Sequence, residues 1–257
     1  MNTKFPQLFP VWFIIAFLGM SESLSAREDS KPNFVIILCD DLGIGDVQSF
    51  NKSGKIKTPN IDQLAAEGRS FSDAHSGSSV CTPTRYGLLT GRYSWRTRLQ
   101  QGVGQGFEPC LIAEDRPTIG SFLQSQGYHT GIVGKWHLGM RFMSPDDPSK
   151  ELEGKPLKFT APVGATTPDG PFNRGFDYFF GIHHARSMKA IIQQDKVTEH
   201  DEVINFLPRC EKEAIAYINE RARKKDQPFF VSAAGVSSYA DCSNQTVAGK
   251  KRFGSVR

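Results

Sequence analysis

Residues 33–39, NFVIILC, form an almost unbroken apolar run with polar residues on both sides. A short apolar run without polar alternation predicts a strand that is buried on both faces, as in a parallel sheet. Two carboxylates, Asp40 and Asp41, follow the run directly. Because ligands of open α/β sheets bind beyond the carboxyl ends of the strands, we expect these two side chains to face a ligand.

The paired carboxylates allow two interpretations. Adjacent carboxylates repel each other unless a cation joins them, and ligands that are all oxygen favour Ca²⁺ or Mg²⁺. Alternatively, the two aspartates belong to a solvated acidic turn, which Gly43, Gly45 and Asp46 would favour. The residues alone leave both interpretations open.

The pattern further along predicts an α/β fold. Residues 117–126 predict a helix that ends at Gly127, and residues 128–133 predict the next strand. Strand, helix and strand in this order indicate a parallel sheet with right-handed crossovers. The net charge of +4 is mild and no basic stripe with interleaved aromatic residues occurs, so the sequence does not favour nucleic acid as a partner.

Four other segments carry predictions about local structure. Residues 58–68 predict a helix capped by Thr58, with Ile61, Leu64 and Ala65 packed inward. Residues 69–75 predict a strand, and residues 141–171 predict a long surface loop. Residues 207–224 predict an amphipathic helix, followed by a strand from 228, and its expected inward side chains are Ala214, Ile215, Ile218 and Ala222.

The stretch around Cys81 predicts a loop, a short helix and a helix stop. Small residues at 76–79 lead into it, Pro83 suits a first helical turn, and Gly91 suits the end. Cys81 then lies at the positive end of a helix, where unpaired backbone N–H groups favour an anion. Arg85, four residues later, lies on the same helical face, so a reactive sulfur and a fixed cation would share one anion-sized space. The alternative is an ordinary helix start with a buried thiol.

Lys135 and His137 follow the strand at 128–133 and are two residues apart. In extended chain such side chains point the same way. A lysine can hold an anionic oxygen and a histidine can transfer a proton, which suits an anionic ester as substrate. A surface pair is the alternative.

Four segments together resemble the sulfatase family, and the closest resemblance is to the arylsulfatases. They are CTPTR with GLLTGR at 81–92, GKWHLG at 134–139, the opening at 32–46, and NRGFDYFFG at 173–181. The resemblance covers residues 31–230 and identifies them as the N-terminal part of a sulfatase catalytic domain. It implies an alkaline-phosphatase-like α/β/α sandwich with a mostly parallel mixed sheet, incomplete at the C-terminus.

The family's chemistry is implied for the matching residues. Cys81 would be oxidised to formylglycine by a formylglycine-generating enzyme, and the hydrated aldehyde would attack the sulfur of a sulfate ester. Arg85 would steady the aldehyde hydrate, and His137 would contact it and help to release sulfate. Lys135 would bind the substrate. The activity implied is that of a sulfuric ester hydrolase.

The resemblance also implies a cation, with Asp40, Asp41 and residue 81 as its ligands. Calcium is expected, with magnesium as the less favoured ion. The substrate would be a sulfated small molecule or a sulfated polysaccharide. Three residues near the pocket, His183, His184 and Ser187, have no assigned role, and a plain loop is the alternative for them. Rival functions are a phosphatase or phosphonate hydrolase of the same superfamily and a non-catalytic truncated remnant.

The N-terminus predicts export. Lys4, the apolar run at 11–20 and the small residues at 21–26 have the pattern of a secretory signal peptide, residues 1–26, cleaved near Ala26, without a stable membrane anchor. The five cysteines are widely and irregularly spaced, which argues against a disulfide framework. Structural zinc is also unexpected, because no CxxC motif occurs.

The resemblance ends after Phe230, and residues 231–257 are expected to be a non-family tail that is disordered or frame-shifted. The codons that can encode the residues from Val236 onward can also encode SPHTPIVPTKQWQGKSG if one base is dropped. This second sequence resembles what sulfatases have at this point of the chain. We therefore hypothesise a frame slip near the Phe229 and Phe230 codons. The missing motif would carry the histidine that protonates the leaving group, so the printed chain is expected to be inactive on its own.

Overall fold

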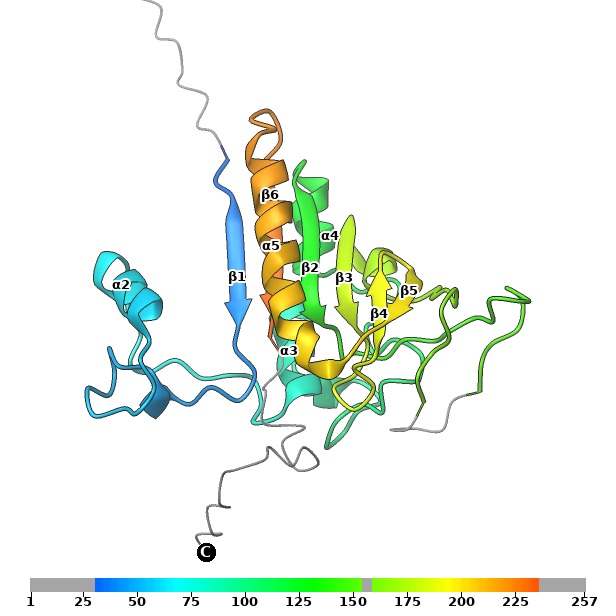
Figure 1. The fold of residues 1–257 in the computed structure, drawn as a ribbon, viewed down its shortest axis with the longest axis horizontal. Coiled ribbons are helices and arrows are strands. Elements are labelled where there is room, and N and C mark those ends of the chain that lie inside the picture. The colour runs from blue at the N-terminus through cyan, green and yellow to red at the C-terminus, as the bar shows by residue number, and fades with distance from the viewer. Residues whose placement is uncertain (1–30, 154–158, 236–257) are drawn as a thin grey trace, which may run out of the picture. The chain divides into compact units, whose positions relative to one another are not determined.

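The computed structural model describes residues 31–153 and 159–235. A six-stranded sheet with the order β1-β6-β2-β3-β4-β5 forms its centre (Figure 1). The strands are β1 (Phe34–Leu38), β2 (His129–Lys135), β3 (Tyr178–Ile182), β4 (Ala190–Gln193), β5 (Lys196–His200) and β6 (Phe229–Ala234). The first four strands in the sheet order are parallel, and β4 and β5 add an antiparallel hairpin. The predicted α/β class with a mostly parallel sheet is confirmed.

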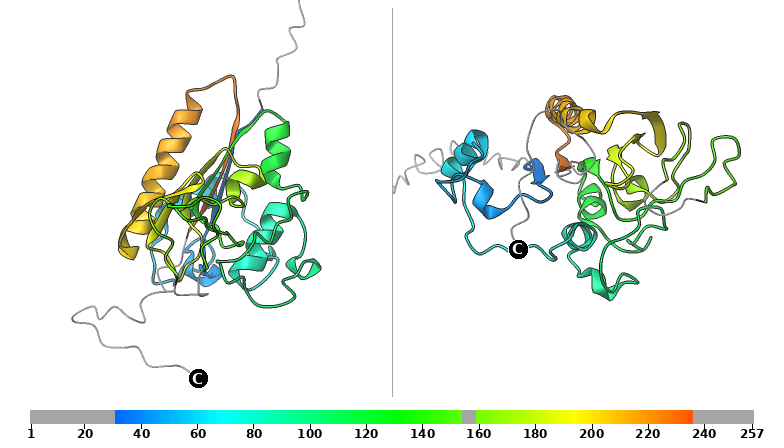
Figure 2. Two further views of the ribbon diagram at one scale, coloured as in Figure 1. Left: turned by 90° about the vertical axis from the view of Figure 1, so that its right-hand side faces the viewer. Right: turned by 60° about the horizontal axis from the view of Figure 1, so that its bottom comes forward.

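Helices cover both faces of the sheet (Figure 2). The α-helices are α2 (Pro59–Glu67), α3 (Cys81–Thr90), α4 (Ile119–Ser125) and α5 (Phe206–Ala222). Side chains of α3 and α4, such as Tyr86 and Leu123, pack with Ile132 of β2 in one core cluster. On the opposite face, Tyr217 of α5 packs with Val133 in a second cluster. The strands are therefore held between two helical layers.

The central strands approach very closely near their carboxyl ends. Gly134 has φ +114, and a Cβ atom there would lie 2.0 Å from the carbonyl oxygen of Ala234 on β6. A Cβ atom on Gly181 would lie 1.7 Å from the carbonyl oxygen of Gly134. No side chain can enter at these distances, and the φ value suits glycine. The two glycines thus let three strand ends converge beside the candidate site.

Three expectations about the N-terminal third are wrong. β1 is a strand, but within the described residues it pairs with β6 alone, and Ile37 is 70 % exposed rather than buried. The helix at 58–68 forms as α2, yet none of its residues is buried, and the side chain of Thr58 bonds Asp62 and Gln48 instead of capping the helix. Residues 69–75 form turns instead of a strand.

Two expectations about the later part need correction. The predicted surface loop at 141–171 is confirmed for residues 145–151, which are exposed, but its two ends are packed: Phe142 is fully buried and stacks on Phe107, and Ala161 and Ala165 are buried. Helix α5 confirms the predicted amphipathic helix, but Ile215 and Ala222 are exposed instead of buried. The buried residues of this helix are Phe206, Tyr217 and Arg221. The predicted helix at 117–126 and the strand at 128–133 are confirmed as α4 and β2.

The chain ends carry predictions that the structure does not test. β6 continues past Phe230 to Ala234, while residues 236–257 and the expected signal peptide at 1–26 lie outside the described residues. The domain boundaries at 26 and 230 therefore remain predictions. In the described part of the chain, no helix combines the length and the apolar character that crossing a membrane requires.

Candidate active site

One edge of the sheet brings together residues that are far apart in the sequence. Asp40 and Asp41 follow β1, and they line an open cleft of about 230 Å³ with Cys81 and Arg85 from α3. The small residues Ser76, Ser78 and Ser79 form another side of this cleft. The expectation that the acidic pair lies beyond the carboxyl end of a strand is confirmed, and Cys81 lines the same cleft.

The local sequence explains where α3 begins and ends. Its N-cap, Val80, is extended with φ −134 and has no side chain that can accept a hydrogen bond from the first turn. Its C-cap, Gly91, has φ +63 and donates its N–H to the carbonyl oxygen of Gly87. The predicted loop, helix and stop are confirmed. Because no side chain caps the N-terminus, backbone N–H groups beside Cys81 are free for an anion.

Arg85 joins α3 to the ends of two strands. Its guanidinium donates to the carbonyl oxygens of Lys135, at 2.6 Å, and Gly235, at 3.3 Å, and lies 3.4 Å from a carboxylate oxygen of Asp40. Burial lowers the pKa of Arg85, whereas Asp40 and Cys81 raise it. Its Nε atom is buried and has no hydrogen-bond partner among the described residues. A donor therefore remains for a further oxygen.

Asp40 lies between two cations. One of its carboxylate oxygens accepts a hydrogen bond from Lys135 Nζ at 2.7 Å, and the same oxygen contacts Arg85. The side chains of Lys135 and Arg85 are each 5 % exposed, and that of Asp40 is 13 % exposed. Asp41 is exposed and has a left-handed backbone with φ +62. Such strained backbone in a residue other than glycine is often found at functional sites.

His137 is buried behind the cleft and does not line it. Its backbone has φ +55, so the expected extended geometry from Lys135 to His137 is wrong. Nε2 bonds the carbonyl oxygen of Gly104 at 3.1 Å, and Nδ1 has no partner among the described residues. Burial, followed by the neighbouring His184 and Lys135, lowers the pKa of His137 to about 2. The imidazole is therefore neutral at neutral pH.

The glycine-containing loop at 102–106, whose function the sequence did not indicate, contacts this histidine. Besides accepting from His137, Gly104 donates its N–H to the hydroxyl of Thr82 on α3 at 3.1 Å. A Cβ atom on Gly106 would lie 2.6 Å from His184, whose ring meets that of His137 edge to face at 4.3 Å. The spacing of Gly102, Gly104 and Gly106 was the available signal. Gly106 therefore lets the loop approach the ring of His184, while Gly104 contacts His137 through its backbone carbonyl.

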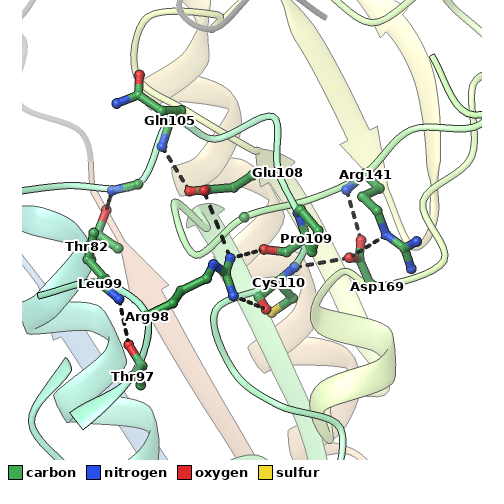
Figure 3. A network of polar contacts seen from close by, with 12 residues as sticks. Thr82, Thr97, Arg98, Leu99, Gln105, Glu108, Pro109, Cys110, Arg141 and Asp169 are labelled. Atoms are coloured by element: carbon green, nitrogen blue, oxygen red, sulfur yellow. Dashed lines mark hydrogen bonds and ion pairs between the residues drawn. The ribbon is translucent and has the colours of Figure 1, made fainter. Parts of the chain in front are cut away.

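A polar network fixes the same loop farther along the chain (Figure 3). Asp169 accepts from the backbone N–H groups of Cys110 and Arg141 and from Arg141 Nε, at 2.8 to 3.0 Å. The guanidinium of Arg98 donates to the carbonyl oxygens of Pro109 and Cys110. The loop that contacts His137 is thus anchored to the chain after β2.

The other candidates lie close to this group. His183 and His184 are both buried, and burial lowers the pKa of His183 to about 3 and that of His184 to about 4. His184 Nδ1 accepts the backbone N–H of Arg186 at 2.9 Å. Ser187 is buried as well. Two of these three residues contact His137 directly: its backbone N–H donates to the carbonyl oxygen of His183 at 2.9 Å, and its ring meets the ring of His184.

The cleft holds part of a donor set for a hard cation. Asp40 and Asp41 offer carboxylate oxygens, which match Ca²⁺ in type, but Ca²⁺ takes about 6–8 oxygen ligands. In residues 31–153 and 159–235, no group of three His, Cys, Asp or Glu side chains is arranged to hold a metal ion. The residues described therefore fit a cation by chemistry, while they supply only part of its coordination.

The comparisons identify the family. The sequence model of the family named Sulfatase matches residues 32–256, so the chain belongs to the sulfatase family. The matched range extends beyond Phe230, where the segment-by-segment resemblance ends. An N-acetylgalactosamine-6-O-sulfatase of Bacteroides thetaiotaomicron is 42 % identical over 116 residues, which are 45 % of this chain and 22 % of that protein. Human arylsulfatase D is 36 % identical over 182 residues, 67 % of this chain and 27 % of that protein.

Solved structures agree on the fold. A Bacteroides thetaiotaomicron 6S-sulfatase, described in work on the metabolism of glycosaminoglycans, has a TM-score of 0.66 at 24 % identity and covers 82 % of this chain and 52 % of its own. Ps i-CgsB, in complex with a neocarrahexaose, has a TM-score of 0.59 at 27 % identity and covers 81 % of this chain and 46 % of its own. The alkaline-phosphatase-like fold is confirmed. The chain spans about a quarter of the curated relatives and about half of these structures.

Proposed function

We propose that this chain carries the sulfate-ester site of an arylsulfatase-like sulfuric ester hydrolase. The observation that carries the proposal is the cleft itself, where Cys81 at the uncapped start of α3 faces Asp40 and lies one helical turn from Arg85. A sulfate ester is an anion, and this cleft offers it backbone N–H groups and nearby cations. Family membership gives this chemistry its support.

The cations near the cleft would hold the sulfate group. Lys135 and Arg85 both pair with Asp40, which lines the cleft, and Arg85 lines the cleft as well. His137 is neutral and its Nδ1 has no partner among the described residues, so it can accept a hydrogen bond from a hydroxyl. We assign substrate binding to Lys135, positioning of the reacting group to Arg85, and acceptance of a hydrogen bond from the aldehyde hydrate to His137.

Residue 81 would act as formylglycine, made from Cys81 by a formylglycine-generating enzyme. When present, the hydrated aldehyde supplies an oxygen nucleophile that a thiol does not offer. The surroundings fit it, because the unpaired Nε of Arg85 is a buried donor and Cys81 lies close enough to influence the pKa of Arg85. Arg85 would therefore orient an oxygen at residue 81.

Calcium is the proposed cation, with magnesium as the second choice. Asp40 and Asp41 would hold it together with residue 81, because all three line the same cleft. A bound divalent cation would draw negative charge from the sulfate oxygens. In the described structure Lys135 and Arg85 balance the charge of Asp40.

A sulfated saccharide is the substrate class that the comparisons favour. One relative is named for N-acetylgalactosamine 6-O-sulfate, and one solved neighbour holds a neocarrahexaose. A small aryl sulfate is the alternative. We also propose that the protein is exported, because residues 1–26 have the pattern of a secretory signal peptide.

The test is sulfate release by the purified chain after coexpression with a formylglycine-generating enzyme. Hydrolysis of 4-nitrophenyl sulfate in the presence of Ca²⁺ that is lost in Cys81→Ala, and kept in Cys210→Ala as a matched change on α5, would support the proposal. The same result would overturn the expectation that the chain is inactive on its own. Faster hydrolysis of the corresponding phosphate or phosphonate ester would favour the phosphatase alternative.

A non-catalytic remnant is the second candidate, and the incomplete cation ligand set favours it. In that case the chain coexpressed with the formylglycine-generating enzyme would bind 4-nitrophenyl sulfate in calorimetry but would release no sulfate. A chain that neither binds nor hydrolyses the ester would contradict both candidates.

A further inference from the structure

A hollow beside the C-terminal half of α3 is lined by four arginines. It has a volume of about 290 Å³, and no carboxylate is among its lining residues. Tyr86 and Leu111 form part of its wall, and the four arginines, which we call the arginine hollow, are Arg92, Arg96, Arg98 and Arg116. None of its lining residues belongs to the cleft around Cys81. The hollow is therefore a separate place on the surface.

The positive charge of the hollow is poorly balanced. Among the described residues, the ion pair found for these arginines is a 3.9 Å contact between Arg98 and Glu108. Glu114 and Asp115 line a neighbouring hollow together with Arg116. Four guanidinium groups repel one another at short range unless an anion joins them.

Two of the arginines are held in place by the chain itself. Arg98 donates to the carbonyl oxygens of Pro109 and Cys110 (Figure 3), and Arg92 donates to the carbonyl oxygen of Arg96 at 3.4 Å. Each guanidinium has five N–H donors, so most of them remain available. A planar fork of donors suits a tetrahedral oxyanion better than a single ammonium does.

An exposed aromatic pair adjoins the arginines. Tyr93 and Trp95 are each 57 % exposed, and their rings stack at 5.8 Å with an angle of 15° between the planes. The guanidinium of Arg96 lies 6.0 Å from the centre of the Trp95 ring. An exposed ring presents an apolar plane, on which the C–H face of a sugar can lie while cations hold its charged substituents.

We propose that the arginine hollow is a second binding site for a sulfated saccharide, in which the arginines hold a sulfate group and Trp95 stacks on the sugar that carries it. The ligand class rests on the proposed function, but the site does not use the cleft. The stacked aromatic pair favours a sugar over an isolated anion. The hollow includes Tyr86 of α3, and Cys81 lies at the start of the same helix, so one long saccharide could engage both sites.

The probe is a dextran sulfate oligosaccharide, compared with unsulfated dextran of the same length by calorimetry. We expect Arg96→Gln with Arg116→Gln to weaken binding about tenfold, or about 1.4 kcal/mol. The matched control is Arg223→Gln with Lys225→Gln, which removes two exposed charges near the end of α5. It should leave the Kd within about twofold, below about 0.5 kcal/mol. Circular dichroism would check that each variant is folded.

Further variants separate the site from its alternatives. Trp95→Ala should weaken the binding of dextran sulfate but not that of inorganic sulfate. Arg96→Gln with Arg116→Gln should retain the binding of 4-nitrophenyl sulfate to the cleft, so a failure of the proposed function is distinguished from a failure of this site. The proposal would be overturned if the two double variants lost the same affinity for dextran sulfate, or if the protein bound oligothymidylate as tightly as dextran sulfate, because either result indicates attraction by charge alone. It would also be overturned if unsulfated dextran bound as tightly as dextran sulfate.

Discussion

Replacing Asp40 by asparagine should destabilise the fold far more than the same change at Asp41. The carboxylate of Asp40 is the shared acceptor of Lys135 and Arg85, whose side chains are each 5 % exposed. An asparagine is nearly the same size but leaves two buried cations without their anion. Breaking a buried ion pair in this way costs about 3–5 kcal/mol.

The assay is urea unfolding followed by circular dichroism, with thermal unfolding as a second measure. For a chain of this size the loss corresponds to a fall in Tm of roughly 6–20 °C. Asp41→Asn is the matched control, because Asp41 is exposed and asparagine tolerates its left-handed backbone. Its effect should stay within about 0.5 kcal/mol.

A double variant tests the cause. Asp40→Asn combined with Lys135→Met removes the stranded ammonium, and it should recover at least about 1 kcal/mol relative to the sum of the single changes. A loss below about 1 kcal/mol for Asp40→Asn, or an equal loss for Asp41→Asn, would refute the reasoning that the charge of Asp40 is needed by two buried cations.

Gly134→Ala should cost more than about 2 kcal/mol in urea unfolding, because a Cβ atom would lie 2.0 Å from the carbonyl oxygen of Ala234 at a φ of +114. Burial lowers the pKa of His183 to about 3. The unfolded chain therefore binds more protons, so stability should fall from about pH 6.5 to pH 3 by up to about 1.4 kcal/mol per pH unit. His183→Gln should reduce the slope of this profile, to which the buried His137 and His184 also contribute, and the exposed His75→Gln should leave the slope unchanged. Asp169→Ala should lower the unfolding free energy by about 2–4 kcal/mol, since three donors lose their acceptor; an unchanged urea midpoint would contradict this.

Some elements could be predicted because their signal is local. The cap at Gly91, the helix stop at Gly127 and the apolar strands depend on neighbouring residues, and all are present. The position of Asp40 in a cleft was also predictable, since ligand sites of α/β sheets lie beyond the strand ends.

Other features depend on contacts that no local pattern contains. Leu64 has a helical apolar pattern, yet it is 68 % exposed, because burial requires a partner surface. Phe142 lies in a polar, proline-rich stretch and is nevertheless fully buried against Phe107. The left-handed backbone of His137 redirects its side chain to Gly104, and an alternation rule for strands cannot foresee that turn.

The chemical state of residue 81 tests the central claim most directly. The chain would be expressed with a formylglycine-generating enzyme, and the peptide that contains residue 81 would be analysed by mass spectrometry before and after reaction with a hydrazide. We expect an aldehyde at residue 81 that forms a hydrazone, and none in Cys81→Ala. An unmodified thiol at residue 81, found while a known sulfatase in the same cells is converted, would contradict the proposed formylglycine chemistry.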